Sequence, residues 1–283
     1  MVNIRNATDM MLLSLTNLES RFIAESTFTD RQGVISPDGR WLAFVSTRTG
    51  NNQVWLAAVD NDSLRQISDL GQVEIRGLHW RNDSEQLIFA ISDRDHRSIY
   101  RTNIISGNTE IIETGGMQAS SAHWLADSND LIFNCLDQSK WKLCFKSGVD
   151  GTSSVISDLD AYDPMVDQAS GLIHFTRDQR GLWSIDLESR EVALVWAELP
   201  RYQSPGWVVH ANTLYYLNSL PVENIAIIEK RDLSTGITEE IYRGPIPGFT
   251  TTLSIDQAGE TLVFPSWRSA HDDLIIFSPI DPD

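Results

Sequence analysis

The sequence predicts an all-β protein, a six-bladed β-propeller built from four-stranded antiparallel blades. The first observation is that six ten-residue stretches align without a gap, each opening on a large apolar residue and closing on an aromatic one: residues 35–44, 80–89, 124–133, 166–175, 207–216 and 255–264. The second is an all-aliphatic column two positions before each close: Leu42, Leu87, Leu131, Ile173, Leu214 and Leu262. The third is the spacing of the repeats, about 41 to 48 residues, which is the length of one propeller blade.

Each strand of the blade has its own signal. A small residue five positions before the close indicates a tight turn between the first and second strands. Its members are Gly39, Ser84, Ser128, Ser170, Ala211 and Gly259. Apolar triplets about ten residues after each aromatic predict the third strands, at residues 54–56, 99–101, 143–145, 182–184, 225–227 and 274–276. Fourth strands are expected at residues 64–67, 110–113, 153–156, 191–195 and 239–242.

The blades then cover about residues 29–68, 72–113, 116–156, 160–197, 201–243 and 247–283, as one domain without a linker. The last repeat ends without a fourth strand, so we expect the N-terminal segment, residues 1–28, to supply the strand that closes the ring. Two apolar runs could do this, residues 11–13 and residues 22–24, and the sequence does not decide between them. The alternative is a disordered leader or a short helix over residues 9–18.

Composition limits the classes of function. Hydrophobic residues make up 41% and charged residues 22%, as in ordinary folded soluble proteins. A net charge of -17 argues against nucleic-acid binding by this chain, because neutralising phosphates requires a basic surface. No apolar run approaches the roughly 18 residues of a membrane-spanning helix, so we expect no span in this chain. The start also lacks the pattern of a secretory signal, although an anchor or signal could lie upstream.

Two cysteines, Cys135 and Cys144, fall on adjacent strands predicted for the third blade. The column position of Cys144 is held elsewhere by large core residues, which favours a small buried thiol over a cross-strand disulfide. A disulfide would need close Cβ atoms and an oxidising compartment. The absence of a CxxC spacing excludes a zinc ribbon or a thioredoxin-like redox motif.

The loops between second and third strands are rich in arginine and suggest a binding rim. In a propeller these loops share one rim with the loops between blades, so their arginines would ring the mouth of the central channel and suit an anionic ligand. The predicted ligand-binding residues are Arg48, Arg94, Arg97, Arg177, Arg180 and Arg268. The alternative is a set of solvated turn pairs with the neighbouring acids Asp93, Asp95, Asp178, Asp272 and Asp273.

Signals for catalysis or metal binding are weak. The sequence has no GxSxG, HExxH or phosphate-binding glycine loop, so we predict no catalytic residue, no cofactor and no enzymatic activity. His79 and His123 hold equivalent places in two repeats, and His174 falls at a packed strand position. The cluster Asp158, Asp160, Asp163 and Asp167 does not follow the EF-hand spacing and is interpreted as turn chemistry, so no metal site is predicted.

Residues 35–44, Ile-Ser-Pro-Asp-Gly-Arg-Trp-Leu-Ala-Phe, resemble the "SPDG...lAF" signature of TolB-like, WD-type propeller repeats. In this signature Pro37 sets the turn, Asp38 caps it and Gly39 takes the unusual dihedral angle. Such blades occur in periplasmic TolB, in the propeller lids of prolyl peptidases and in sensor portions of CadC-like regulators. The resemblance covers nearly the whole chain and implies the fold.

Residues 15–18, followed by the 36–39 repeat, look similar to the start of the extracytoplasmic propeller in CadC-like regulators. This resemblance implies a non-catalytic sensory domain, periplasmic or extracytoplasmic, which binds a protein partner or a small ligand at one rim. A winged helix and a membrane span would then lie upstream, and DNA binding would belong to that part. The alternatives are a free-standing TolB-like periplasmic scaffold, an enzyme with its active site in the channel mouth, and a cytoplasmic location.

Overall fold

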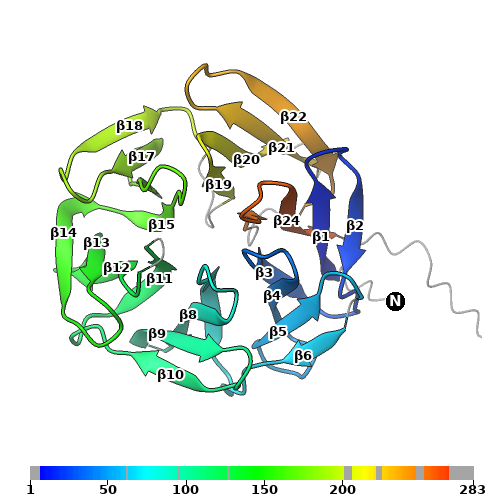
Figure 1. Cartoon of the computed structure of the whole chain (residues 1–283), viewed down its shortest axis with the longest axis horizontal. Coiled ribbons are helices and arrows are strands. Elements are labelled where there is room, and N and C mark those ends of the chain that lie inside the picture. The colour runs from blue at the N-terminus through cyan, green and yellow to red at the C-terminus, as the bar shows by residue number, and fades with distance from the viewer. Residues whose placement is uncertain are drawn as a thin grey trace, which may run out of the picture.

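The computed structural model is a ring of six four-stranded antiparallel sheets, so the predicted all-β six-bladed propeller is confirmed (Figure 1). It describes residues 7–61, 63–94, 96–125, 128–200, 206–220, 225–246 and 252–267. Within these ranges no helix is long and apolar enough to cross a membrane. Consecutive blades occupy consecutive places around the ring, so each sheet covers its faces with its two neighbours.

The strands are numbered in chain order, and each of blades 1 to 5 uses four consecutive strands. Blade 1 contains β3 (Asp30–Ile35), β4 (Trp41–Ser46), β5 (Gln53–Ala58) and β6 (Leu64–Gln66). Blade 2 contains β7 (Glu74–Trp80), β8 (Gln86–Asp93), β9 (His96–Asn103) and β10 (Thr109–Ile112). Blade 3 contains β11 (Ala119–Trp124), β12 (Leu131–Asp137), β13 (Lys140–Lys146) and β14 (Ser153–Asp160). Blade 4 contains β15 (Tyr162–Val166), β16 (Ile173–Thr176), β17 (Leu182–Ile185) and β18 (Val192–Trp196). Blade 5 contains β19 (Trp207–His210), β20 (Thr213–Leu220), β21 (Ile225–Asp232) and β22 (Thr238–Gly244).

Blade 6 joins the two ends of the chain. Its strand order is β23 (Ser254–Ile255), β24 (Thr261–Trp267), β1 (Thr8–Ser14) and β2 (Ser20–Ile23), counted outward from the channel. All seven residues of β1 pair with β24, and in Figure 1 the blue β1 lies beside the orange-red β24. The N-terminal segment therefore closes the ring, as predicted.

The closure uses two N-terminal strands, where the sequence analysis expected one. The run at residues 11–13 lies in β1 and fills the third position, while residues 22–23 lie in β2 and fill the fourth. Assigning residues 274–276 to the third strand of blade 6 was therefore wrong, because β1 pairs with β24 directly. Those three residues lie outside the described part of the chain. The alternative of a leader or helix over residues 9–18 is also wrong, since β1 begins at Thr8.

The repeating columns of the sequence form the core between blades. All six members of the aliphatic column are completely buried, and the six closing aromatic residues are buried as well. The small-residue column allows the tight turns: Gly39, Ser84, Ala211 and Gly259 have φ between 46° and 72°. In blade 4 the left-handed residue is instead Gly171, one position after the predicted Ser170. Large apolar residues therefore pack between the blades, while small residues allow the tight turns between the first and second strands.

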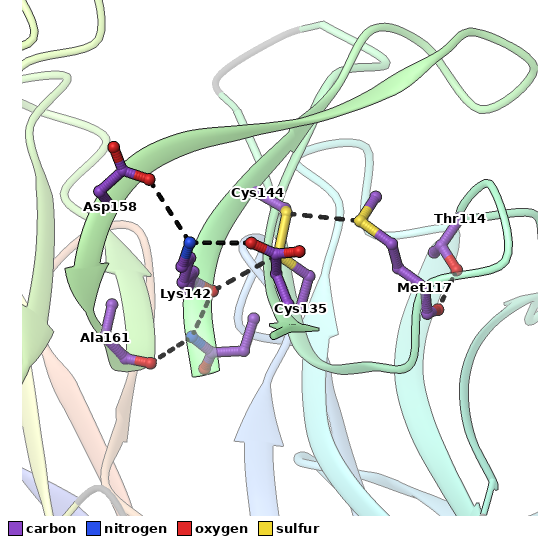
Figure 2. Close-up of a disulfide and its surroundings, with 9 residues drawn as sticks. Thr114, Met117, Cys135, Lys142, Cys144, Asp158 and Ala161 are labelled. Atoms are coloured by element: carbon purple, nitrogen blue, oxygen red, sulfur yellow. Dashed lines mark hydrogen bonds and ion pairs between the residues drawn. A yellow bond between two sulfur atoms is a disulfide. The ribbon is translucent and has the colours of Figure 1, made fainter. Parts of the chain in front are cut away.

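Cys135 on β12 and Cys144 on β13 form a disulfide within blade 3, with a Cα–Cα distance of 5.8 Å (Figure 2). The preference for a small buried thiol was therefore wrong. The strand register explains the bond: Cys135 lies opposite Lys142, and Cys144 lies two residues further along, so the two sulfur atoms are diagonal neighbours on one face. Both cysteines are completely buried, and Cys144 Sγ lies 3.9 Å from Met117 Sδ.

Substituting Leu13 in β1 tests the closure. Its side chain is fully buried in the cluster that joins blade 6 to blade 5, so Leu13→Ala should lower the free energy of unfolding by about 2–5 kcal/mol. Leu18→Ala, in the exposed turn after β1, should change it by less than about 0.5 kcal/mol. Urea unfolding followed by tryptophan fluorescence measures both variants. Equal effects of the two substitutions would contradict this closure.

Reduction should weaken blade 3. The disulfide closes a loop with a sequence separation of 9 residues, for which a chain-entropy estimate gives about 2–3 kcal/mol of stabilisation. Urea unfolding with and without dithiothreitol should show this difference in the wild type. The double variant Cys135→Ala/Cys144→Ala should show no effect of the reductant. Two thiols that titrate freely in the oxidised, denatured protein would rule out the bond.

Candidate functional site: the central channel

The innermost strands of all six blades surround a cavity of about 170 Å³ on the propeller axis. Residues of β3, β7, β11, β15, β19 and β23 line it. Four residues in turns between first and second strands also line the cavity: Pro37, Asn82, Gln168 and Gln257. Because neighbouring strands are antiparallel, these turns lie on the rim opposite the second-to-third-strand loops. The cavity therefore reaches the rim opposite the predicted arginine ring.

Four consecutive innermost strands carry a bulge at the same position. In each of them the pairing with the second strand shifts register. The residue three places before the apolar residue that opens the ten-residue repeat has left-handed backbone angles. These residues are Gln32 (φ 54°), Gly77 (φ 61°), Ser121 (φ 43°) and Asp163 (φ 50°). A bulge leaves its extra residue outside the regular ladder, and such strained conformations concentrate at functional sites. Gln32, Gly77 and Ser121 line the cavity.

Gly77 is required by close packing as well as by its backbone. A Cβ atom at this position would lie 3.0 Å from Ser121 Cα on the next blade. The sequence analysis missed the bulge column, although a signal was present. The position three places before each opening holds Gln, Gly, Ser, Asp, Ser and Thr, all of them small or polar.

Within the described residues, hydrogen bonds that involve side chains join neighbouring blades around the channel at five of its six junctions. Trp80 Nε1 donates to Val34 O at 2.9 Å, and Gly77 N donates to Gln32 Oε1 at 3.2 Å. Further around the ring, Trp124 N donates to His79 Nδ1 at 3.4 Å, and Gln168 Nε2 donates to Trp124 O at 3.4 Å. Ala211 N donates to Asp167 Oδ1 at 3.3 Å, and Ile35 N donates to Ser254 Oγ at 3.2 Å. The channel wall is therefore fixed by bonds between blades as well as within them.

Two imidazole rings contact each other in the channel wall. His79 on β7 and His123 on β11 have ring centroids 4.1 Å apart. Burial lowers the pKa of His79 to about 4, and burial together with the neighbouring His79 lowers the pKa of His123 well below its usual value. Both rings are therefore neutral near pH 7. His123 is 8% exposed, and its Nδ1 has no hydrogen-bond partner among the described residues.

The five predicted arginines that the structure describes do not line this cavity, and most of them have protein partners. Arg97 lies over the Trp141 ring at 5.0 Å, and Arg180 donates to the carbonyl groups of Glu198 and Leu199. Arg177 binds Asp160 at 3.0 Å and lies over Trp183 at 4.7 Å. Arg94 is exposed in its turn, and Arg268 lies outside the described residues. Their role in ligand binding stays a prediction.

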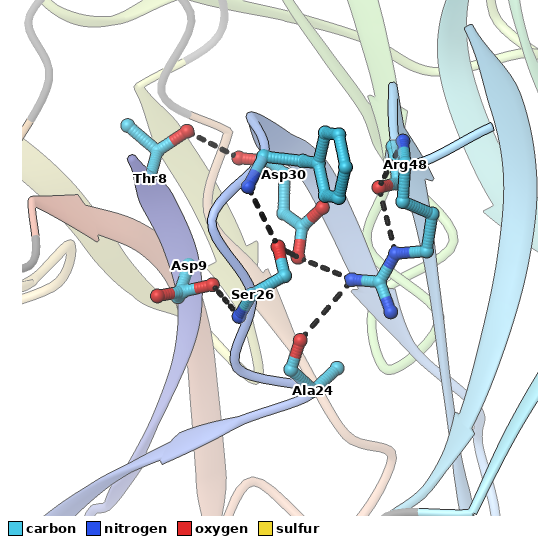
Figure 3. Close-up of polar contacts among 8 residues, drawn as sticks. Thr8, Asp9, Ala24, Ser26, Asp30 and Arg48 are labelled. Atoms are coloured by element: carbon cyan, nitrogen blue, oxygen red, sulfur yellow. Dashed lines mark hydrogen bonds and ion pairs between the residues drawn. The ribbon is translucent and has the colours of Figure 1, made fainter. Parts of the chain in front are cut away.

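Arg48 belongs to the ring closure rather than to a free surface (Figure 3). Its guanidinium binds Asp30 at 2.7 Å, donates to Ala24 O and lies 5.1 Å from the ring centroids of both Phe44 and Trp55. Thr8 Oγ1 donates to the backbone of Asp30, and Asp9 Oδ1 accepts from Ser26 N. These contacts bind β1 and the segment after β2 to blade 1.

Burial, together with the nearby carboxylate of Asp9, raises the pKa of Asp30 to about 6. The hydroxyl of Ser46 and the guanidinium of Arg48 act in the opposite direction without cancelling the effect of burial. Both Asp9 and Asp30 are completely buried, so the closure holds two carboxyl groups close to one guanidinium.

The acidic residues singled out in the sequence serve separate local contacts. Asp158 accepts from Lys142, Asp160 from Arg177, and Asp167 from Ser170 and Ala211. Across the described ranges, no group of three or more His, Cys, Asp or Glu side chains could hold a metal ion. His174 is buried, as the sequence predicts, with its pKa lowered to about 4 by burial.

Comparison with known proteins places the fold. No protein-family model matches this chain. A stretch of 34 residues is 53% identical to an uncharacterised protein of Agrobacterium fabrum, a match that spans 12% of each protein. TolB from Acinetobacter baumannii aligns with a TM-score of 0.65 at 11% identity, over 92% of this chain and 63% of that one. The shared feature is the propeller.

Two further solved structures have the same architecture. Oligogalacturonate lyase in complex with manganese aligns with a TM-score of 0.58 at 14% identity, over 95% of this chain and 81% of that one. A chain of the nidogen/laminin complex aligns with a TM-score of 0.60 at 11% identity, over 92% and 98%. These identities are too low to carry more than the fold.

The buried carboxyl group of Asp30 should make stability depend on pH. Because its pKa is higher in the folded than in the unfolded state, the contribution of protonation is fully present below about pH 4 and is lost as pH rises through about 6. The unfolding free energy of the wild type should therefore fall relative to that of Asp30→Asn as the pH rises from 4 to 6. Urea unfolding across this range measures it. A shift in favour of the wild type would show that attraction to Arg48 outweighs burial.

Proposed function

We propose that this propeller is a non-catalytic binding module that recognises a small ligand or a protein at the rim where the central channel opens. The supporting observation is the cavity on the axis, whose lining combines apolar side chains with a few hydrogen-bonding groups from several blades. Four of the blades also hold strained bulges at the channel, which is a feature of sites that bind.

In this proposal the module is the sensory domain of a CadC-like membrane-anchored regulator, outside the cytoplasm. The support is the resemblance of residues 15–18 and 36–39, together with the disulfide of blade 3, since structural disulfides persist mainly in oxidising compartments. The first alternative is a free-standing periplasmic scaffold, favoured by the shared fold with TolB.

The second alternative is an enzyme with its active site in the same channel. The imidazoles of His79 and His123 would be the natural proton acceptors there. A general base works best with a pKa near the operating pH, and burial lowers the pKa of His79 to about 4. This difference favours binding over catalysis. Turnover in a screen of hydrolase and lyase substrates would overturn that preference.

Blocking the channel mouth tests the binding module. Gln257 is exposed and lines the mouth, whereas Ala258 is exposed in the same turn and does not line the cavity. A thermal-shift screen with charged, uncharged and peptide ligands should find compounds that stabilise the wild type and Ala258→Trp but not Gln257→Trp. Equal responses of both variants for every compound found would exclude the channel as the binding site.

The upstream reading frame separates the sensor from the scaffold. A winged helix and one membrane span encoded in frame before this propeller are expected for the sensor. A secretory signal followed by a separate α/β domain is expected for a TolB-like scaffold, and finding it would contradict the regulator.

The arginine rim has its own test. Titration calorimetry with phosphate and sulfate should show at least tenfold weaker binding for Arg94→Ala/Arg97→Ala than for the wild type, if that rim holds an anion. Lys230→Ala/Arg243→Ala, on strands β21 and β22 of blade 5, serves as the control with the same loss of two positive charges. Unchanged titrations would end the anion hypothesis and leave the channel as the site.

A further inference from the structure

We infer that the central channel binds a small, uncharged, ring-sized molecule that hydrogen-bonds to His123, whose imidazole packs against that of His79. The inference rests on the proposed function and deepens it by naming a class of ligand. Four features of the channel carry it: its volume, its unpartnered polar atoms, its lack of a free charge and its bulges.

The volume sets the size of the ligand. The cavity holds about 170 Å³. An apolar protein cavity of roughly 150 Å³ is sufficient for one benzene molecule. A single substituted ring therefore fills this channel, whereas a disaccharide or a folded peptide segment would not fit inside it.

The lining supplies the recognition. Val34, Leu78 and Val209 are among the apolar side chains of the wall. His123 also lines the cavity, is more than nine-tenths buried, and has an Nδ1 atom without a hydrogen-bond partner among the described residues. Thr252 Oγ1, from blade 6, is a second buried lining atom without a partner. An unpaired buried polar group is costly, so a ligand that reorients the ring of His123 and bonds to it recovers that cost.

The charge of the lining favours an uncharged ligand. His79 and His123 are neutral near pH 7 because burial lowers the pKa of each. Asp256 is the formally charged residue among the described residues of the lining, and its Oδ1 already accepts from Glu260 N at 2.8 Å and Thr261 N at 3.1 Å. An anion would have no counter-charge here, and a cation would face only the buried carboxylate of Asp256, which these backbone N–H groups already stabilise. Burial of a poorly paired ion is strongly unfavourable.

The bulges are an independent indication that this part of the wall binds. Gln32, Gly77 and Ser121 line the cavity with left-handed backbones, two of them at residues that carry side chains. Such conformations persist only where the surrounding structure holds them. Here the hydrogen bond from Gly77 N to Gln32 Oε1 and the contact of Gly77 with Ser121 do so. The result is a rigid, preformed collar beside the imidazole pair.

A panel of ring-sized probes tests the class of ligand. The uncharged members are phenol, benzyl alcohol and benzamide, and the size-matched charged members are benzoate and benzylammonium. Ligand-observed NMR with the full chain at pH 7.5 should show binding of uncharged probes and at least tenfold weaker binding of the charged ones.

Two matched variants locate the binding. His123→Leu should weaken binding of the uncharged probes at least tenfold. His174→Leu should leave binding unchanged, because His174 is an equally buried imidazole with an unpaired Nδ1 and does not line the channel. Gln257→Trp should block binding without replacing a buried group.

Three results would overturn the inference. They are no binding of any uncharged probe at millimolar concentration, tighter binding of benzoate or benzylammonium, or equal binding by His123→Leu and the wild type. If larger or charged compounds stabilise the wild type but not Gln257→Trp, the binding module stands and this class of ligand fails. If no compound distinguishes Gln257→Trp from Ala258→Trp, the proposed function fails with it.

Discussion

The pairing of β1 with β24 is the constraint on which the rest of this structure depends. A propeller blade covers its apolar faces only when it has a neighbour on each side, so a ring with one incomplete blade would expose the faces of blades 1 and 5. The seven-residue ladder between β1 and β24, followed by β2, completes blade 6 from the opposite end of the chain. Opening the ring therefore requires breaking contacts between residues more than 240 positions apart.

Closure also explains the surroundings of Arg48. The side chain belongs to a loop where an exposed cation could bind a ligand, yet it lies over two aromatic rings and binds the buried carboxylate of Asp30. Removing either partner would leave a buried charge unpaired, so this pair acts in the architecture. The binding site that we propose lies instead on the axis, where the six innermost strands converge on a small cavity.

The fold could be predicted from the sequence because the repeated columns mark the apolar positions that each blade buries. Leu42 and its five equivalents are fully buried, and the small residues of the turns have the expected backbone. The sequence did not show that the N-terminal segment supplies two strands of blade 6, because its two apolar runs were alternatives for one expected strand. It also could not place the disulfide, since diagonal positions on neighbouring strands appear only once the register is known.

The candidate site was less predictable. Loop position alone drew attention to the arginines, whose partners, such as Asp160 for Arg177, come from distant segments. His79 and His123 were noted as equivalent in two repeats, but their contact across neighbouring blades required the ring geometry. The bulge position holds a small or polar residue in every repeat, yet only the backbone angles show that it is a bulge.

Amide hydrogen exchange in β1 tests the central claim most directly. If β1 completes blade 6, the amides of residues 10–13 should exchange as slowly as those of residues 87–89 in the core of blade 2, with the free energy of global unfolding. Exchange of the β1 amides orders of magnitude faster than those of blade 2 would show that the N-terminal strand detaches on its own, which would contradict a ring that depends on this closure.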